Sequence, residues 1–201
     1  MPDGFQPGGR APAPAPLDLV QDFVNTEIPD WNRDDVATPD ALGAWLRTRG
    51  LIRPDDAVDG DTFVAARALR SALRELALAN TLGEPLAPER REAVDAALGA
   101  FPLVVRAGDD GPGIAPAGDG ARRGLASLVA IVAAARAGGS WERLKACRQE
   151  TCGWLFYDGS RNRSSSWCSM QVCGNREKAR TFRKRTRAQN LDHQNTTLAT
   201  V

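Results

Sequence analysis

The sequence has a single histidine, His193, and no cysteine before position 147. It has no His–carboxylate set, no nucleophile elbow and no phosphate-binding glycine loop, patterns that are typical of many enzymes. No apolar run approaches the roughly 18 residues of a membrane-spanning helix. The first residues, MPDGFQPGGRAPAPAP, lack the basic start and apolar core of a secretory signal. We therefore expect a soluble cytoplasmic protein that is not an enzyme.

Charge is small overall but unevenly distributed. The net charge of the 201 residues is +1. Residues 141–189 carry twelve Lys and Arg against four Asp and Glu, a balance of +8, and the rest of the chain has a balance of −7. A basic C-terminal part beside an acidic body indicates a polyanionic partner for that part alone, or attraction between the two parts within one chain or between chains.

The pattern along the chain predicts a mainly α fold with a small β-hairpin (α+β). Residues 1–16 alternate Ala and Pro and predict a disordered or extended arm. Residues 17–140 predict a helical domain, with helices over 17–26, 38–49, 60–82, 87–100 and 122–139 and a hairpin near 101–117. Residues 141–190, which contain all the cysteines, predict a separate module, and residues 191–201 predict a flexible tail. The expected inward-facing residues of the helices are Leu19, Val20, Phe23, Val24, Leu42, Trp45, Leu46, Phe63, Ala66, Leu69, Leu73, Leu76, Leu82, Leu125, Leu128, Val129 and Val132.

All the cysteines of the chain lie within 27 residues, at Cys147, Cys152, Cys168 and Cys173. Two C-x4-C pairs separated by fifteen residues suit four thiolates around one tetrahedral ion, and zinc favours this set. Two disulfides would need an oxidising compartment, and a redox pair would favour C-x-x-C. An iron–sulfur cluster also takes four cysteines, so spacing alone leaves it open. Four sulfur ligands leave no position for water, and we expect one structural zinc per chain.

A basic helix is predicted directly after the last cysteine, from about 175 to 189, because these residues include no Pro or Gly. One side of it, expected to pack on the metal module, carries Asn175, Ala179, Phe182 and Thr186. The basic residues predict contact with nucleic acid, with Arg176 reading a base and Arg183 and Arg187 on phosphates. The alternative is a solvated face or one that pairs with acidic groups. The full set expected at nucleic acid, including two loop arginines, is Arg161, Arg163, Arg176, Lys178, Arg180, Arg183, Lys184, Arg185 and Arg187.

The segment CGWLFYDGSRNRSSSWCSMQVCGNREKAR resembles the CGNR zinc-finger family, which takes its name from the residues at 173–176. The resemblance covers the four cysteines, the F-x-D-x-S-R-N-R segment at 156–163 and the W-C-S-M segment at 167–170. It implies a treble-clef-like zinc module with four cysteine ligands that ends in a basic helix. Zinc on the four cysteines and DNA on Arg176, Lys178 and Arg180 are likewise implied. Ser164, Ser165 and Ser166 stand where the family often has arginines, which weakens this loop as a phosphate contact.

The upstream part resembles the ABATE domain, a module of stress-induced transcription regulators in bacteria, through DFVNT at 22–26. The two resemblances imply a DNA-binding regulator. Two further hypotheses are a zinc-stabilised protein-interaction module and a sensor that binds a small ligand. Asp22 and Asn25 lie one helical turn apart and form the candidate ligand-binding pair, although such residues more often cap or cross-link helices. The partners expected are DNA, a second copy in a homodimer, and an effector of unknown identity.

Overall fold

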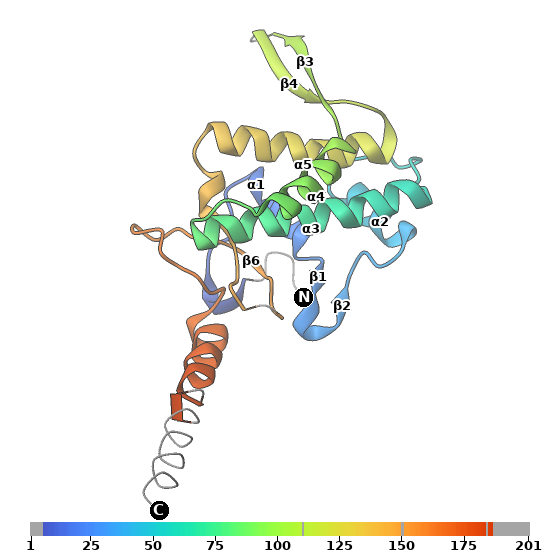
Figure 1. The fold of residues 1–201 in the computed structure, drawn as a ribbon. Helices are drawn as coiled ribbons and strands as arrows, with labels where there is room; N and C mark the ends of the chain where they lie inside the picture. The colour runs from blue at the N-terminus through green and yellow to red at the C-terminus, as the bar shows by residue number, and fades with distance from the viewer. Residues whose placement is uncertain (1–5, 110, 150, 184, 187–201) are drawn as a thin grey trace, which may run out of the picture.

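The computed structural model describes residues 6–109, 111–149, 151–183 and 185–186. A helical body carries small antiparallel strand pairs, and a cysteine-rich module with a projecting helix follows it (Figure 1). The fold class predicted from the sequence, mainly α with a small β component, is confirmed. Within the described part of the chain, no helix has both the length and the apolar character needed to cross a membrane.

The helices of the body are α1 (Leu17–Val24), α2 (Pro39–Thr48), α3 (Gly60–Leu82), α4 (Pro88–Gly99) and α5 (Gly120–Ala137). Their ends follow the local chemistry of the sequence. Thr38 accepts a hydrogen bond from the Ala41 N–H and caps α2, and Asp59 accepts one from the Thr62 N–H and caps α3. Gly83 stops α3 with a φ of +69°, a conformation that only glycine adopts without strain.

One main hydrophobic core lies among α1, α2, α3 and α5. Buried side chains from each of these helices contribute, including Phe23, Leu46, Leu69 and Leu125. Of the expected inward-facing residues, Leu82 was predicted wrongly, because it is the last residue of α3 and is 42% exposed. Helix α5 approaches the chain after α2 closely at Gly124, where a Cβ atom would lie 2.8 Å from the Leu51 carbonyl oxygen. A side chain at this position would push α5 away from the core.

The predicted hairpin is formed by β3 (Leu103–Gly108) and β4 (Gly111–Pro116). It stands out from the body at the top of Figure 1. Its cross-strand partners Val105 and Ile114 are 74% and 62% exposed. The β-branched run and the turn residues therefore predict these strands correctly, but these two apolar residues are not part of the core.

A second, shorter hairpin was not predicted. Strands β1 (Glu27–Ile28) and β2 (Arg33–Asp34) flank a 3-10 turn, η2 (Pro29–Trp31). Buried Arg70 of α3 donates two hydrogen bonds of 2.7 Å to the Asp34 carboxylate. Burial alone would raise the pKa of Asp34, but these bonds outweigh it and lower the pKa. The guanidinium of Arg74 adds a hydrogen bond of 2.8 Å to Glu27. Two arginines of α3 thus hold this hairpin beside the body.

A third hairpin joins the body to the cysteine-rich module. It pairs β5 (Leu144–Ala146) with β6 (Leu155–Tyr157), and β5 follows a short 3-10 turn, η3 (Trp141–Arg143). Because side chains alternate along a strand, its two faces meet different surroundings. Leu144, Ala146 and Leu155 belong to the main core, whereas Phe156 packs with the cysteines. The two parts of the chain therefore share one hairpin.

Of the two alternatives expected for residues 1–16, disorder is wrong for residues 6–16, because this segment is held against the rest of the protein. Gln6 is buried and its Oε1 accepts hydrogen bonds from Gln21 and from the Trp154 indole. The Arg10 guanidinium donates to the carbonyl oxygens of Cys168 and Trp167. We call residues 6–13 the strap. Sequence composition does not predict its order, because that order comes from contacts with residues almost 160 positions away. Residues 1–5 and the tail 191–201 lie outside the described residues.

Candidate metal centre and basic helix

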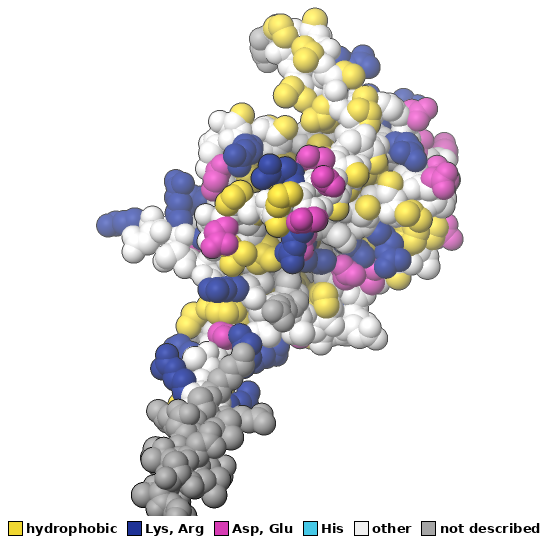
Figure 2. Space-filling model, viewed as in Figure 1, with side chains coloured by type: hydrophobic (Ala, Val, Ile, Leu, Met, Phe, Trp, Pro, Cys, Tyr) yellow, Lys and Arg dark blue, Asp and Glu magenta, His cyan; other side chains and the backbone are white. Residues whose placement is uncertain are grey.

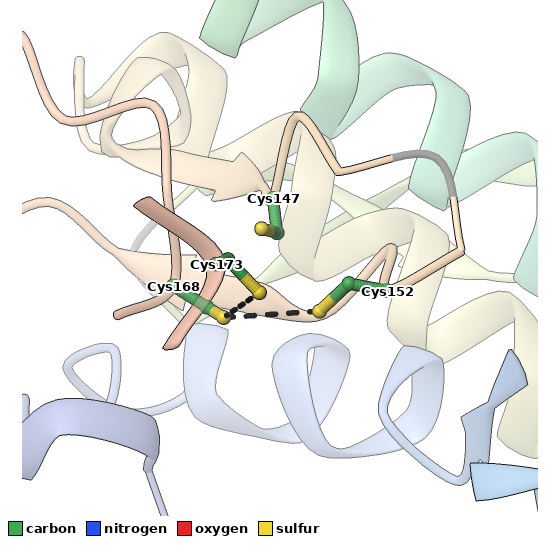
Figure 3. Close-up of side chains that lie close together, drawn as sticks. All are labelled: Cys147, Cys152, Cys168 and Cys173. Carbon is green, nitrogen blue, oxygen red and sulfur yellow. Dashed lines mark hydrogen bonds between the residues drawn. The ribbon is translucent and has the colours of Figure 1, made fainter. Parts of the chain in front are cut away.

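The four cysteine side chains converge on one point in the C-terminal module (Figure 3). All four are buried, and their sulfur atoms lie within 4.8 Å of one another. The Sγ atoms of Cys152 and Cys168 are 3.7 Å apart, and those of Cys168 and Cys173 are 3.6 Å apart. A tetrahedral site with zinc–sulfur bonds of about 2.3 Å places its sulfurs about 3.8 Å apart. These separations fit a single zinc ion and are far too long for disulfide bonds.

Two structural units bring the thiols together. Cys147 follows β5 and Cys152 precedes β6, and the knuckle between them is closed by a hydrogen bond from the Cys147 N–H to the Trp154 carbonyl. Cys168 comes just before a π-helical turn, η4 (Met170–Gly174), which contains Cys173. A knuckle on a hairpin together with a helical start is the treble-clef-like arrangement that was predicted. Gly153 in the knuckle has a φ of +58°, and a Cβ there would lie 3.0 Å from Arg74.

The thiols perturb one another because they are buried together. Hydrogen bonds from Cys152 and Cys168 lower the pKa of Cys147. Hydrogen bonding to Cys147 in turn raises the pKa of Cys152 and Cys168, and burial followed by the charge on Cys147 raises that of Cys173. Four thiolates therefore cannot coexist here without a compensating cation. A zinc dication supplies that charge, and its binding releases protons.

A small apolar cluster surrounds the sulfur atoms. It contains Trp154, Phe156 and Ile28 in addition to the cysteines, with Trp167 packed against it. The neighbouring Leu155 lies in the main core, because it points to the other face of β6. The guanidinium of Arg10 lies 4.6 Å from the centroid of the Phe156 ring. The strap thus covers the metal module from one side.

A buried ion pair organises the loop between the cysteine pairs. Lys145 and Asp158 are 5% and 0% exposed and lie 3.0 Å apart, and Asp158 also accepts hydrogen bonds from Ser160 and Ser165. Burial would raise the pKa of Asp158, but hydrogen bonds from Ser160, Lys145 and Ser165 outweigh it and lower the pKa well below its usual range. This fixes the loop and leaves Arg161 and Arg163 exposed.

A helix follows the centre directly, with α-helical conformation at 175–183 and 185–186. It projects away from the body and carries Lys and Arg side chains on its surface (Figures 1 and 2). The expectation that Asn175, Ala179, Phe182 and Thr186 pack on the metal module is wrong, because all four are exposed and Phe182 is 70% exposed. The helix leaves the module at its first turn, so no module surface lies beside its later described turns.

Among the predicted cations that the structure describes, two have acidic partners. Arg176 donates a hydrogen bond of 2.6 Å to Asp30 of η2, and Arg180 makes two hydrogen bonds to Glu177 one turn earlier. Lys178, Arg183 and Arg185 are exposed on the same helix. Lys184, Arg187 and His193 lie outside the described residues. Part of the basic surface is therefore already paired with carboxylates before any partner binds.

The side chains of the predicted pair Asp22 and Asn25 contact different parts of the protein. The Asn25 side chain donates to the Leu155 carbonyl at 2.9 Å and accepts from the Leu155 N–H at 2.7 Å. The carboxylate of Asp22 lies 3.9 Å from the guanidinium of Arg49. Asn25 therefore bonds both backbone groups of Leu155 at the edge of β6, as a neighbouring strand would. The cross-linking alternative for these residues is the one that the geometry favours.

A cleft that no sequence pattern indicated lies between α3, α4 and α5. Its volume is about 890 Å³, within the range of small-molecule sites. Its apolar walls include Leu76, Leu86, Leu98, Val129 and Val132. These residues come from segments far apart in the sequence, so their convergence depends on how the helices pack.

The comparisons with known proteins agree with this geometry. Residues 17–139, more than half of the chain, match the ABATE family model, described as "Putative stress-induced transcription regulator". The chain belongs to the ABATE family. Residues 143–186 match the CGNR zinc finger. No curated protein matches the chain.

The family assignment gives the CGNR residues a structural setting in this ABATE protein. Its zinc finger brings together four cysteines that are able to hold one zinc ion. Of the residues at 173–176, Cys173 belongs to the sulfur cluster, Gly174 is buried, and Asn175 and Arg176 begin the exposed helix. A Cβ on Gly174 would lie 2.7 Å from the sulfur of Met170, a flexible side chain that is 49% exposed and can move aside. Neither matching family is an enzyme family.

We expect one zinc per chain when the protein is purified without added metal, because four buried cysteine sulfurs at these separations can bind one dication as thiolates. Elemental analysis by mass spectrometry measures this directly. Cys173→Ser should reduce the zinc content at least about tenfold, since loss of a single ligand usually weakens a structural site strongly. Ser164→Ala, in the exposed loop, is the matched control and should retain full zinc. Iron in place of zinc, or full zinc in the Cys173→Ser variant, would contradict the assignment.

Asn25→Ala should lower the free energy of unfolding by about 1–3 kcal/mol, because the Leu155 N–H loses its partner in a buried setting. The Leu155 carbonyl keeps a hydrogen bond from Gln21, which limits the loss. Urea unfolding of the zinc-loaded protein gives the value. The free energy of unfolding of Asn25→Asp should lie between those of Asn25→Ala and wild type, since a carboxylate accepts from the N–H but cannot donate to the carbonyl. Asn162→Ala, at an exposed position, should change stability by less than about 0.5 kcal/mol. Equal stability of Asn25→Ala and wild type would show that the clamp is unimportant.

Proposed function

We propose that this ABATE protein is a transcription regulator that binds DNA through the basic helix of its CGNR zinc finger. The observation that carries the proposal is the helix itself. It starts at the metal centre, leaves the body at once and exposes Lys178, Arg183 and Arg185 to solvent. A helix anchored at one end by zinc and cationic over its length is a common way to enter a groove of DNA. The description of the ABATE family as a regulator supports the same function.

The loop between the cysteine pairs adds to this basic surface. Arg161 and Arg163 are exposed on it, and the buried pair of Lys145 and Asp158 holds the loop in place. Pre-ordering reduces the entropy that the loop loses when it contacts a phosphate. The body of the protein has a net negative charge, so DNA is expected to meet the C-terminal module and avoid the rest.

Because Arg176 is paired with Asp30, the basic residues are not expected to contribute equally to DNA binding. A phosphate must replace the Asp30 carboxylate before Arg176 gains a new partner. Arg183 is exposed, and among the described residues no carboxylate forms an ion pair with it, so it needs no such exchange. We therefore assign the stronger phosphate contact to Arg183. Arg176 contributes less to binding as long as Asp30 holds it.

Arg183→Ala should weaken binding to all duplex sequences alike and lower the slope of log affinity against log salt by about 1. Fluorescence anisotropy with a labelled duplex over a series of salt concentrations measures both quantities. Arg176→Ala should have a smaller effect, and a larger one in the Asp30→Ala background. Zinc content is measured first in each variant. Salt-independent binding, or no binding of any duplex by the zinc-loaded protein, would contradict the proposed function.

A second candidate function, contact with another protein chain, is favoured by the β3–β4 hairpin. The Ala117 N–H donates to the Pro102 carbonyl at 3.0 Å, and bonding then alternates along the hairpin. The outward positions of β4 accordingly include Pro112 and Pro116, which have no N–H. Strand β3 has no proline, so its outer edge keeps its donors. We infer that a second copy adds to β3 in a homodimer and covers the exposed Val105 and Ile114.

Val105→Lys should therefore convert a dimer to a monomer, because it places like charges opposite each other between the two β3 strands. Size-exclusion chromatography with light scattering measures the mass of the species in solution. Val64→Lys is the matched control, because Val64 is 67% exposed on α3 and lies away from the hairpin sequence. A wild-type protein that stays monomeric at high micromolar concentration would rule out this interface.

A further inference from the structure

The exposed side of the basic helix carries an aromatic side chain in addition to its basic residues. Of the described residues at 175–183 and 185–186, only Glu177 and Thr181 are partly buried, and all the others are exposed. Glu177 and Thr181 lie one turn apart on one side of the helix and are hydrogen-bonded to each other, with Arg180 also bonded to Glu177. The opposite side contains Phe182, which is 70% exposed. On this exposed face, Phe182 adds apolar surface to the charge that the helix offers to a partner.

The residues around Phe182 form an ordered pattern. At about 100° per residue, four of them fall within an arc of about 60° and form what we call the central stripe. The central stripe comprises Asn175, Ala179, Phe182 and Thr186. Basic residues flank it at about 70–90° on both sides, with Arg176 and Arg183 on one side and Lys178 and Arg185 on the other. An amide, a methyl, a phenyl and a hydroxyl group thus lie in a row between two cationic edges.

We propose that the central stripe reads base edges in the major groove of duplex DNA, while the two cationic edges contact the phosphates of the opposite strands. This inference rests on the proposed function and names the surface that carries specificity. The major groove is about 12 Å wide and admits one α-helix between two phosphate backbones. Cations on both sides of a central row match that geometry. Asparagine pairs with adenine, and apolar groups contact the thymine methyl, so the expected target is rich in A·T pairs.

The same charges disfavour a second copy of the helix as the occupant of this surface. Two such helices packed along their central stripes would bring cationic edge against cationic edge, in either a parallel or an antiparallel arrangement. Like charges in that position are destabilising. A polyanion reverses the sign of the interaction. Phe182 is then exposed in the free protein, and DNA covers its apolar surface in the complex.

This assignment changes the role first expected for Arg176. Its position on the helix places it at a cationic edge and not in the central stripe, and it is paired there with Asp30. Asn175 lies one position earlier and is exposed, and its side-chain nitrogen is 3.2 Å from the Gln171 carbonyl. Its amide oxygen can accept a hydrogen bond from the adenine amino group. Asn175 is therefore the residue to which we assign the most selective contact.

The test begins with the zinc-loaded full chain and a randomised duplex library, from which the bound sequences are selected. Affinity for the preferred duplex and for a scrambled duplex is then measured by fluorescence anisotropy. Asn175→Ala should weaken binding to the preferred duplex by about 5- to 150-fold and leave the scrambled duplex almost unchanged. Phe182→Ala should relax the preference at A·T positions. Because Phe182 is exposed, this second variant is expected to fold and to keep its zinc.

Two controls on the same helix define the outcome. Thr181→Ala, on the side of the helix away from the central stripe, should leave both affinities unchanged, and Arg183→Ala should lower both equally. If no preferred sequence emerges, or if the stripe variants lose affinity equally for both duplexes, the base-reading role is wrong although DNA binding stands. If Phe182→Ala separates a dimer into monomers, the stripe is a contact between copies and the base-reading role is likewise wrong. Absence of salt-dependent binding to any duplex would instead overturn the proposed function itself.

Discussion

The structure depends on a single electrostatic constraint. The sulfur atoms of four buried cysteines lie within 4.8 Å of one another, and all four can be thiolates only when a cation lies among them. Their mutual hydrogen bonds can ionise Cys147, but burial and its charge then oppose ionisation of the others. One zinc ion satisfies all four at once. Chain segments far apart in the sequence meet around this point, namely the strap, η2, the knuckle and η4. The metal therefore fixes where the basic helix begins and in which direction it leaves.

The β5–β6 hairpin transmits this constraint to the helical body. Leu155 and Phe156 are neighbours in sequence but belong to different hydrophobic clusters on opposite faces of β6. Asn25, directly after α1, pairs with the same strand through both its donor and its acceptor. The ABATE body and the zinc finger are therefore not independent units. A movement of either part is expected to displace the other through this hairpin.

Much of this arrangement was predictable from the sequence, because it depends on local chemistry. The helix caps at Thr38 and Asp59 and the Gly83 stop act within one turn, and two close cysteine pairs are a local pattern for four ligands. What was missed depends on long-range packing. Composition predicts disorder for the strap, since it cannot show that Arg10 meets Phe156. Periodicity groups Phe182 with its stripe correctly, but it cannot tell whether the stripe faces protein or solvent.

The central claim is that zinc holds together the strap, the knuckle and the start of the basic helix. Hydrogen–deuterium exchange on the full chain, with zinc bound and after chelation, tests it most directly. The account predicts faster exchange after chelation at residues 6–13 and from Cys147 to the helix at 175–183, with α3 and α5 still protected. Equal protection of residues 147–175 with and without zinc would contradict it.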